Sequence, residues 1–164
     1  MAYYKRVLEK TPVGDITIYA QDDYIIKIKF GKYEIDEYPI TEGLCKVLLD
    51  VEVQLDQYFH GLLREFKLDL ICEATEYEQL VWSNLCSVEY GEKITYKELA
   101  KICGNVKGSR AVAKALSKNN LPIIIPCHRV IKSDGSIGGY TPNTNIKKIL
   151  LELEEKYSNL QNNK

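Results

Sequence analysis

Apolar and polar residues alternate along the N-terminal part of the chain, which is the pattern of β-strands. The alternation extends over three segments, Tyr3–Glu9, Asp15–Ala20 and Asp23–Gly31. Turn-forming residues, Thr-Pro-Val-Gly, separate the first two. Short strands that follow one another so closely predict a small antiparallel sheet.

The spacing of apolar residues then changes to that of a helix. Apolar residues three or four positions apart share one helix face, and Gly61 ends the pattern. These residues are Leu44, Val47, Leu48, Val51, Leu55 and Phe59. A short extended piece, Glu65–Ile71, comes next. We therefore predict an N-terminal α/β domain over residues 1–73 and a second domain over residues 74–164.

Two segments of the second domain have the sequence of a capping box. In each of them, Thr75–Glu78 and Thr95–Glu98, the threonine can cap a helix while the glutamate reaches back to it. The residues expected on the buried faces are Tyr77, Leu80, Val81 and Leu85 in the first helix, and Leu99 and Ile102 in the second. The chain changes here from strands to helices.

A third helix, Ser109–Asn119, is predicted to have one apolar and one basic face. The apolar face holds Val112, Ala115 and Leu116, and the opposite face holds Arg110, Ala113, Lys114 and Ser117. With the preceding helix and a glycine-bearing loop, it has the outline of a helix-turn-helix, which is a weak signal because many helical hairpins bind nothing. A last helix, Asn145–Tyr157, should bury Ile146, Ile149, Leu150 and Leu153. The fold class is therefore α+β.

Composition and charge narrow the class of protein. The 164 residues are 45% hydrophobic and 27% charged, as in globular proteins. No run approaches the roughly 18 apolar residues of a membrane span, and the N-terminus lacks the apolar core of a secretory signal, so we predict a cytoplasmic protein. The net charge is −1, yet Thr95–Lys132 holds eight lysine or arginine residues and one glutamate. This asymmetry fits an anionic ligand and, equally well, a solvated lysine-rich face.

Candidate chemistry is concentrated at Cys127, His128 and Arg129, which are adjacent and follow an apolar run. A thiol with a pKa of about 8.5 is mostly protonated at neutral pH, so a nucleophilic cysteine needs a base such as His128. A third group normally orients the imidazole, and Glu152 or Glu154 could supply it from the last helix. Arg129 is a cation beside the reactive pair.

The remaining cysteines predict no further chemistry. The five cysteines form no C-x-x-C pair, and the chain has only two histidines, so neither disulfides nor a metal site are predicted. Four of them lie in apolar patterns and are interpreted as core residues. They are Cys45, Cys72, Cys86 and Cys103.

The sequence IPCHRVI resembles the active-site sequence of the O6-alkylguanine-DNA alkyltransferases, also called methylated-DNA-protein-cysteine methyltransferases. The match continues in register through VWSNL, ITYKELA, GSRAVAKAL, NNLPIIIPCHRVI, GGY and LLELE. TPVGDITIYA and LDQYFHGLLREF resemble the family's N-terminal domain, so the match covers nearly the whole chain. It implies a ribonuclease H-like N-terminal lobe and a C-terminal helical domain with a helix-turn-helix and an active-site loop.

The resemblance also implies a function. The protein would be a monomeric, cofactor-free suicide enzyme of DNA repair, which transfers the alkyl group of O6-alkylguanine or O4-alkylthymine irreversibly to Cys127. It would bind double-stranded DNA from the minor groove and flip the damaged base out of the stack. His128 would be the base, acting through water, and Glu154 would orient it. Asn119 would brace the site, and Tyr96 would help to turn out the nucleotide and donate to the purine.

Further residues are implied in binding. Arg110 would fill the gap in the duplex, and small residues beside it would let the helix approach the groove closely while lysines contact phosphates. These are Ser109, Ala111, Ala113, Lys107, Lys114 and Lys118. The base pocket would include Tyr96, Val130, Tyr140 and Thr141. The resemblance gives Arg129 no chemical step, so we expect it to anchor the site or the phosphate backbone.

The sequence departs from the family at several positions, including Ala113 and Asn120, where glycine and proline are common, and two alternatives remain. TPNTN follows Gly139–Tyr140, where the family usually has a small residue and two glycines, and this change in the loop could alter which alkyl groups fit. A cysteine hydrolase could use Cys127 and His128 with Asn119 as the orienting group, but it would leave Arg110 without a role. A noncatalytic lesion-binding protein is the other alternative, and the presence of Cys127 argues against it.

Overall fold

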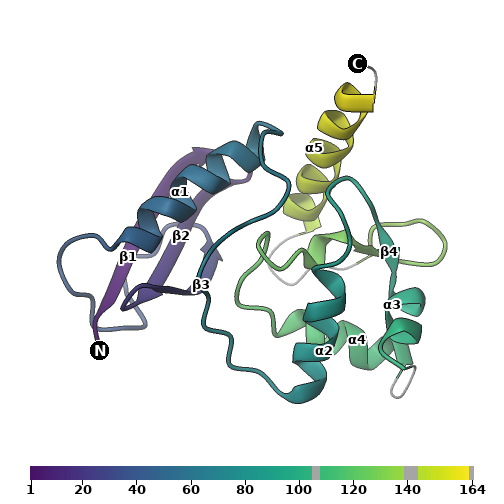
Figure 1. The fold of residues 1–164 in the computed structure, drawn as a ribbon, viewed down its shortest axis with the longest axis horizontal. Helices are drawn as coiled ribbons and strands as arrows, with labels where there is room; N and C mark the ends of the chain where they lie inside the picture. The colour runs from purple at the N-terminus through teal and green to yellow at the C-terminus, as the bar shows by residue number, and fades with distance from the viewer. Residues whose placement is uncertain (105–107, 139–143, 163–164) are drawn as a thin grey trace. The chain divides into compact units, whose positions relative to one another are not determined.

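A computed structural model describes residues 1–104, 108–138 and 144–162 of the chain. The chain divides into two compact units, Met1–Cys72 and Glu73–Lys164. The N-terminal unit consists of an antiparallel sheet and a helix, and the C-terminal unit is mostly helical (Figure 1). The predicted α+β class is confirmed.

Three strands form the sheet of the N-terminal unit, β1 (Tyr3–Thr11), β2 (Gly14–Gln21) and β3 (Tyr24–Phe30). They are antiparallel in the order β1-β2-β3, with Ile18 of β2 opposite both Arg6 and Ile28. The central strand is buried from Ile16 to Ala20 on both faces, so both faces of the sheet must be covered.

Helix α1 (Lys46–Phe59) lies along one face of this sheet (Figure 1). The side chains that it buries are Val47, Leu48, Val51, Leu55, Tyr58 and Phe59. The predicted face is thus confirmed except at Leu44, which precedes the helix and is exposed. Of the extended piece Glu65–Ile71, Leu70 forms a parallel bridge with Ile25 of β3.

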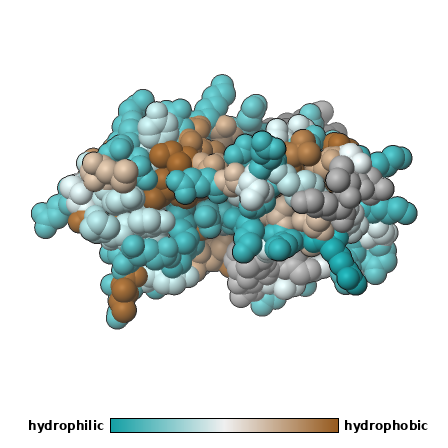
Figure 2. Space-filling view, turned by 90° about the horizontal axis from the view of Figure 1, so that it is seen from below, coloured by the Kyte–Doolittle hydropathy of each residue, from teal (hydrophilic) through white to brown (hydrophobic). Residues whose placement is uncertain are grey.

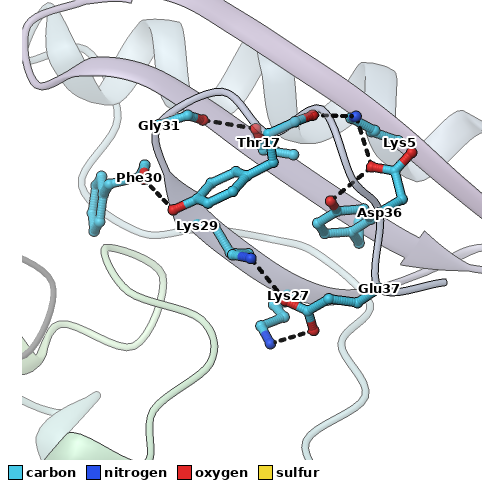
Figure 3. A network of polar contacts seen from close by, with 10 residues as sticks. Lys5, Thr17, Lys27, Lys29, Phe30, Gly31, Asp36 and Glu37 are labelled. Carbon is cyan, nitrogen blue, oxygen red and sulfur yellow. Dashed lines mark hydrogen bonds and ion pairs between the residues drawn. The ribbon is translucent and has the colours of Figure 1, made fainter.

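A polar network fixes the segment after β3 over the other face (Figure 3). Lys27 and Lys29 of β3 each bind Glu37 at 2.8 Å. Lys5 of β1 binds Asp36 at 2.7 Å. The lysines hold the pKa of both carboxyls below their usual values through these hydrogen bonds. The ion pairs are partly exposed, so they position the segment more than they stabilise it.

The C-terminal unit begins with α2 (Glu76–Leu85), and both halves of its predicted capping box are present. Glu78 N donates to Thr75 Oγ1 at 3.1 Å, and Thr75 N donates to Glu78 Oε1. The predicted buried face is wrong at Leu80, which is exposed, while Trp82 is buried. Trp82 can be buried because its only polar side-chain atom has a partner: Nε1–H donates to Ala115 O at 3.0 Å.

Helices α3 (Tyr96–Ile102) and α4 (Gly108–Ser117) pack on each other as the predicted helix-turn-helix. Thr95 caps α3 by accepting from Glu98 N at 3.0 Å. Leu99 is buried as predicted, but Ile102 at the end of α3 is exposed. The two predicted faces of α4 are confirmed, since Val112, Ala115 and Leu116 are buried and the opposite residues are exposed.

Two very short strands bring distant parts of this unit together. Strand β4 (Ile94–Thr95) pairs in parallel with β5 (Val130–Ile131), with Ile94 opposite Val130. Strand β4 leads directly into α3, and β5 directly follows a 3-10 turn, η1 (Cys127–Arg129). The pairing therefore places the start of α3 beside the sequence that contains Cys127.

The last described helix, α5 (Thr144–Asn162), fully buries only Leu150 of the four residues predicted for its buried face. Ile149 is exposed, and the prediction for it is wrong. The fully or nearly buried residues are Lys147, Leu150, Leu151 and Glu154. The buried face of α5 therefore brings two charged side chains into the interior of the unit.

Hydrophilic residues cover most of the face shown in Figure 2, and hydrophobic ones gather in small patches. Singly scattered apolar side chains are normal on protein surfaces. Among the described residues, no helix is both long enough and apolar enough to span a membrane.

Candidate functional site

A buried turn leads the chain to Cys127. Ile125 N donates to Leu121 O at 2.9 Å, and Ile123 between them has a φ of 73°. This left-handed conformation is rare for a β-branched residue and is held here by burial, since Ile123 is 1% exposed. The three isoleucines of the run therefore turn the chain back on itself, and η1 begins directly after Pro126.

Cys127 is buried, with 7% of its surface exposed, and Asn119 contacts its sulfur. Asn119 Nδ2 lies 3.2 Å from Cys127 Sγ and also donates to Ile125 O at 2.9 Å. Asn119 Oδ1 accepts from Leu121 N at 2.9 Å. The amide thus holds both ends of the turn as well as the thiol, and it does so from just beyond the C-terminal end of α4.

His128 and Glu154 form a fully buried pair. His128 Nε2 lies 2.6 Å from Glu154 Oε2. Burial lowers the pKa of His128, and Glu154 only partly opposes this shift. Burial alone would raise the pKa of Glu154, but the contacts with His128 and then Arg129 outweigh it and hold that pKa far below its ordinary range. An ionised carboxylate only accepts, so Nε2 carries the proton and Nδ1 is the basic nitrogen.

Arg129 is the second partner of Glu154. Its Nε donates to Oε1 at 2.8 Å and its Nη2 to Oε2 at 3.1 Å, which is the bidentate geometry of a strong pair. Its Nη1 donates to Val88 O at 2.7 Å. Arg129 is 5% exposed. Of the two expected roles, the described contacts fit the structural anchor.

Tyr96 and Lys147 lie close enough to Cys127 for its charge to affect the pKa of each. Burial and, to a smaller extent, Cys127 raise the pKa of Tyr96, so its phenol stays protonated at neutral pH. Lys147 Nζ donates to Val130 O at 2.6 Å and lies 5.7 Å from the centre of the Tyr96 ring. Burial lowers the pKa of Lys147 to about 8. Val130 is a predicted residue of the base pocket, and its backbone carbonyl is thus bound by a lysine.

The basic face of α4 is exposed to solvent. Ser109, Arg110, Ala113 and Lys114 are exposed, and Ala111 is partly exposed. Gly108 begins the helix with a φ of +73°, and no atom would lie within 4 Å of a Cβ there. Two small side chains and two cations therefore share one accessible helix face.

Three predicted residues, Lys107, Tyr140 and Thr141, lie outside the described residues. Of the four cysteines interpreted as core residues, only Cys103 is buried, and that interpretation is wrong for Cys72 and Cys86, which are exposed. In the part of the chain that the structure describes, no three His, Cys, Asp or Glu side chains are grouped as metal ligands would be.

Sequence reasoning missed two groups of the site. Lys147 lies seven positions before Glu154 on α5, so the helical period indicates that the two share a face. A backbone group also contributes, because Gly91 N donates to Glu154 Oε1 at 3.2 Å. No sequence pattern predicts that contact, since it depends on a turn of the chain that meets α5.

Comparisons with known proteins agree with this arrangement. Residues 2–71 match the family model for the ribonuclease-like domain of 6-O-methylguanine DNA methyltransferase, and residues 76–156 match that for its DNA binding domain. A methylated-DNA--protein-cysteine methyltransferase of Methanosarcina barkeri is 39% identical, over 93% of this chain and 97% of that protein. Its counterpart in Mycobacterium bovis is 43% identical, over 94% and 93%.

A solved structure is similar over the same length. The crystal structure of Mycobacterium tuberculosis OGT in complex with DNA has a TM-score of 0.84 and 31% sequence identity. The similarity covers 96% of this chain and 94% of that one. The chain therefore belongs to the 6-O-methylguanine DNA methyltransferase family.

Proposed function

We propose that this chain repairs DNA by transferring the alkyl group of an O6-alkylguanine to Sγ of Cys127. Alkyl transfer in DNA repair and binding to DNA follow from the family. The observation that carries the assignment of the site is the buried pair at 2.6 Å between His128 Nε2 and Glu154 Oε2, in which His128 directly follows Cys127 in the chain. An oriented base next to the thiol in the chain supports the proposal, because a nucleophilic thiol must lose its proton.

The proton is taken from Cys127 by His128 Nδ1. Side chains of adjacent residues point apart, so a water molecule would bridge the thiol and the imidazole. Glu154 accepts from Nε2 and stabilises the imidazolium that forms. Because the pKa of His128 lies below its ordinary value, the imidazole is neutral and able to accept a proton at neutral pH.

The thiolate then displaces guanine from the alkyl carbon in line. The Sγ–C bond forms as the O6–C bond breaks, and the electron pair of that bond goes to the purine. Tyr96 donates a hydrogen bond that stabilises the developing negative charge, which its raised pKa permits. A thioether is not cleaved again, so each molecule acts once and needs no cofactor. The same chemistry would accept O4-alkylthymine.

The alkyl group on O6 is hidden in the base stack, so the nucleotide must be flipped into the site. We propose that α4 enters the minor groove, where Ser109, Ala111 and Ala113 permit close approach and Lys114 binds phosphate. Arg110 would occupy the gap that the flipped base leaves. Lys107, Tyr140 and Thr141 stay predicted contacts, and a cytoplasmic monomer stays the expected form of the protein.

The proposal is tested with a duplex oligonucleotide that carries one O6-methylguanine. Mixed with excess lesion, the intact protein should gain the mass of a single methyl group, and peptide mapping should locate it on Cys127. A protein whose mass stays unchanged after prolonged incubation would contradict transfer. A hydrolase would turn over and keep its original mass at the end, which separates that alternative.

Arg110→Ala should slow transfer from duplex DNA by roughly 10- to 100-fold, because the flipped state, which costs a few kcal/mol, loses its support. Transfer from the free base O6-methylguanine should change little. The measurement is the single-turnover rate on both substrates, with Lys148→Ala on the exposed surface of α5 as a matched loss of charge. Equal losses on duplex and free base would refute the role of Arg110.

A further inference from the structure

The turn formed by residues 88–91 contacts both Arg129 and Glu154, which form a buried ion pair. Val88 O accepts from Arg129 Nη1 at 2.7 Å, and Gly91 N donates to Glu154 Oε1 at 3.2 Å. The guanidinium of Arg129 also lies 5.9 Å from the centre of the Tyr90 ring. The turn closes on itself through Glu92 N, which donates to Glu89 O at 3.0 Å. It is therefore a compact element that contacts Oε1 of Glu154, whereas His128 contacts Oε2.

Gly91 N can donate to Glu154 Oε1 only because Gly91 has no side chain. Its φ is +83°, and a Cβ there would overlap Ser158 Oγ and lie 2.8 Å from Ser158 Cβ. Rotating the Ser158 side chain would remove the first overlap but not the second, because Cβ is fixed by the helix backbone. Any larger residue at position 91 must push the turn and α5 apart.

The donor matters because Glu154 shares its two oxygens among several groups. Oε2 accepts from His128 and Arg129, while Oε1 accepts from Arg129 and from Gly91 N. Without the hydrogen bond from Gly91 N, the Glu154 carboxylate can rotate toward Arg129, which donates two hydrogen bonds to it, and away from the imidazole of His128. The position of Oε2 against His128 then loses one of its restraints.

We propose that Gly91 is a positioning residue for alkyl transfer, because its backbone N–H holds the Glu154 carboxylate in the orientation that hydrogen-bonds to His128. This inference rests on the proposed function, in which His128 is the base. Gly91 contacts neither the thiol nor DNA in that function, and it acts only through Glu154.

The test compares Gly91→Ala with Gly135→Ala in the single-turnover transfer assay. Gly135 has a φ of +89°, and a Cβ there would meet nothing within 4 Å, so both variants bear the same backbone strain and only one is crowded. Gly91→Ala should slow methyl transfer by about 10-fold or more, by analogy with the loss of hydrogen bonds that orient metal ligands. Gly135→Ala should match the wild type, and binding to the lesion duplex should be the same in all three.

Two readouts separate positioning from a general structural effect. The double variant Gly91→Ala/Ser158→Gly removes both overlapping atoms and should recover most of the rate, measured against Ser158→Gly alone. Glu154 raises the pKa of His128, so loosening the contact should shift the acid limb of the rate profile to lower pH in Gly91→Ala. Should Gly91→Ala fold poorly, Ser158→Val crowds the same contact from α5 and should give the same loss and the same shift.

Several outcomes would overturn the inference. Gly91→Ala or Ser158→Val that transfers as fast as Gly135→Ala would show that the contact does not matter to the reaction. A double variant that stays as slow as Gly91→Ala would attribute the loss to backbone strain. A wild type that takes up no methyl group would instead contradict the proposed function, so the two claims fail separately.

Discussion

Replacing Cys127 with alanine should abolish uptake of the methyl group entirely. Of the five cysteines only Cys127 is adjacent in the chain to His128, which Glu154 orients, so we expect no other thiol to take its place. Intact mass after incubation with excess O6-methylguanine duplex measures the loss. Binding to that duplex should persist, because the exposed face of α4 is unchanged.

Cys103→Ala is the matched control for this loss. Like Cys127, Cys103 is buried and has an asparagine amide near its sulfur, with Asn84 Nδ2 at 3.7 Å. Burial raises the pKa of Cys103, and no histidine is adjacent to it in the chain, so it should stay a thiol. The variant should therefore transfer normally. Methylation of Cys103 in the wild type, or of Cys127→Ala at any site, would show that the nucleophile has been wrongly assigned.

Replacing Glu154 with alanine should have the largest combined effect on stability and rate. The change leaves His128 and Arg129 buried without their shared counter-charge, which costs about 3–5 kcal/mol of unfolding free energy. Loss of the oriented base should also slow transfer by roughly 10²- to 10⁴-fold. Urea unfolding and single-turnover kinetics measure the two effects, and Glu152→Ala, exposed on the same helix, is the control.

The stabilisation that Glu154 contributes should depend on pH in a definite direction. The pKa of Glu154 is lower in the folded than in the unfolded protein, so its stabilisation is present above its ordinary value of 4.5 and is lost as pH falls through the folded value. Glu154→Gln should therefore be less stable than the wild type near neutral pH, and the difference should narrow in acid. A difference that stays constant from neutral pH into acid would argue that the carboxylate is not held ionised by its neighbours.

Local patterns predicted most of the elements, because the signals that set them are themselves local. The capping box at Thr75 and the two faces of α4 needed no knowledge of the rest of the chain. Patterns failed where a polar group decides which side turns inward. In α2, Trp82 is buried instead of Leu80, because Ala115 O accepts a hydrogen bond from the indole N–H. In α5, the buried face includes Lys147, because its ammonium donates to Val130 O.

Sequence could predict side chains of the site but not its backbone groups. Cys127 and His128 could be named from their place in the sequence, whereas the choice of Glu154 over Glu152 and the role of Asn119 came only from the family resemblance. The contributions of Gly91 and Val130 are backbone groups, and the crowding at Ser158 depends on how closely a turn approaches a helix. Such distances are fixed by packing across about 60 residues of chain, since position 91 meets positions 154 and 158, and neither propensity nor periodicity encodes them.

The separation of His128 and Glu154 along the chain also sets the order in which the reactive thiol is completed during synthesis. Glu154 is added 26 residues after His128, which at about 5–20 residues per second takes roughly one to five seconds. Until α5 has been made and packed, a growing chain has the proposed nucleophile and base but lacks Glu154, which orients His128. We expect a ribosome-bound chain to be spared from alkylation at Cys127, so that the single reaction each molecule can perform is kept for the finished protein.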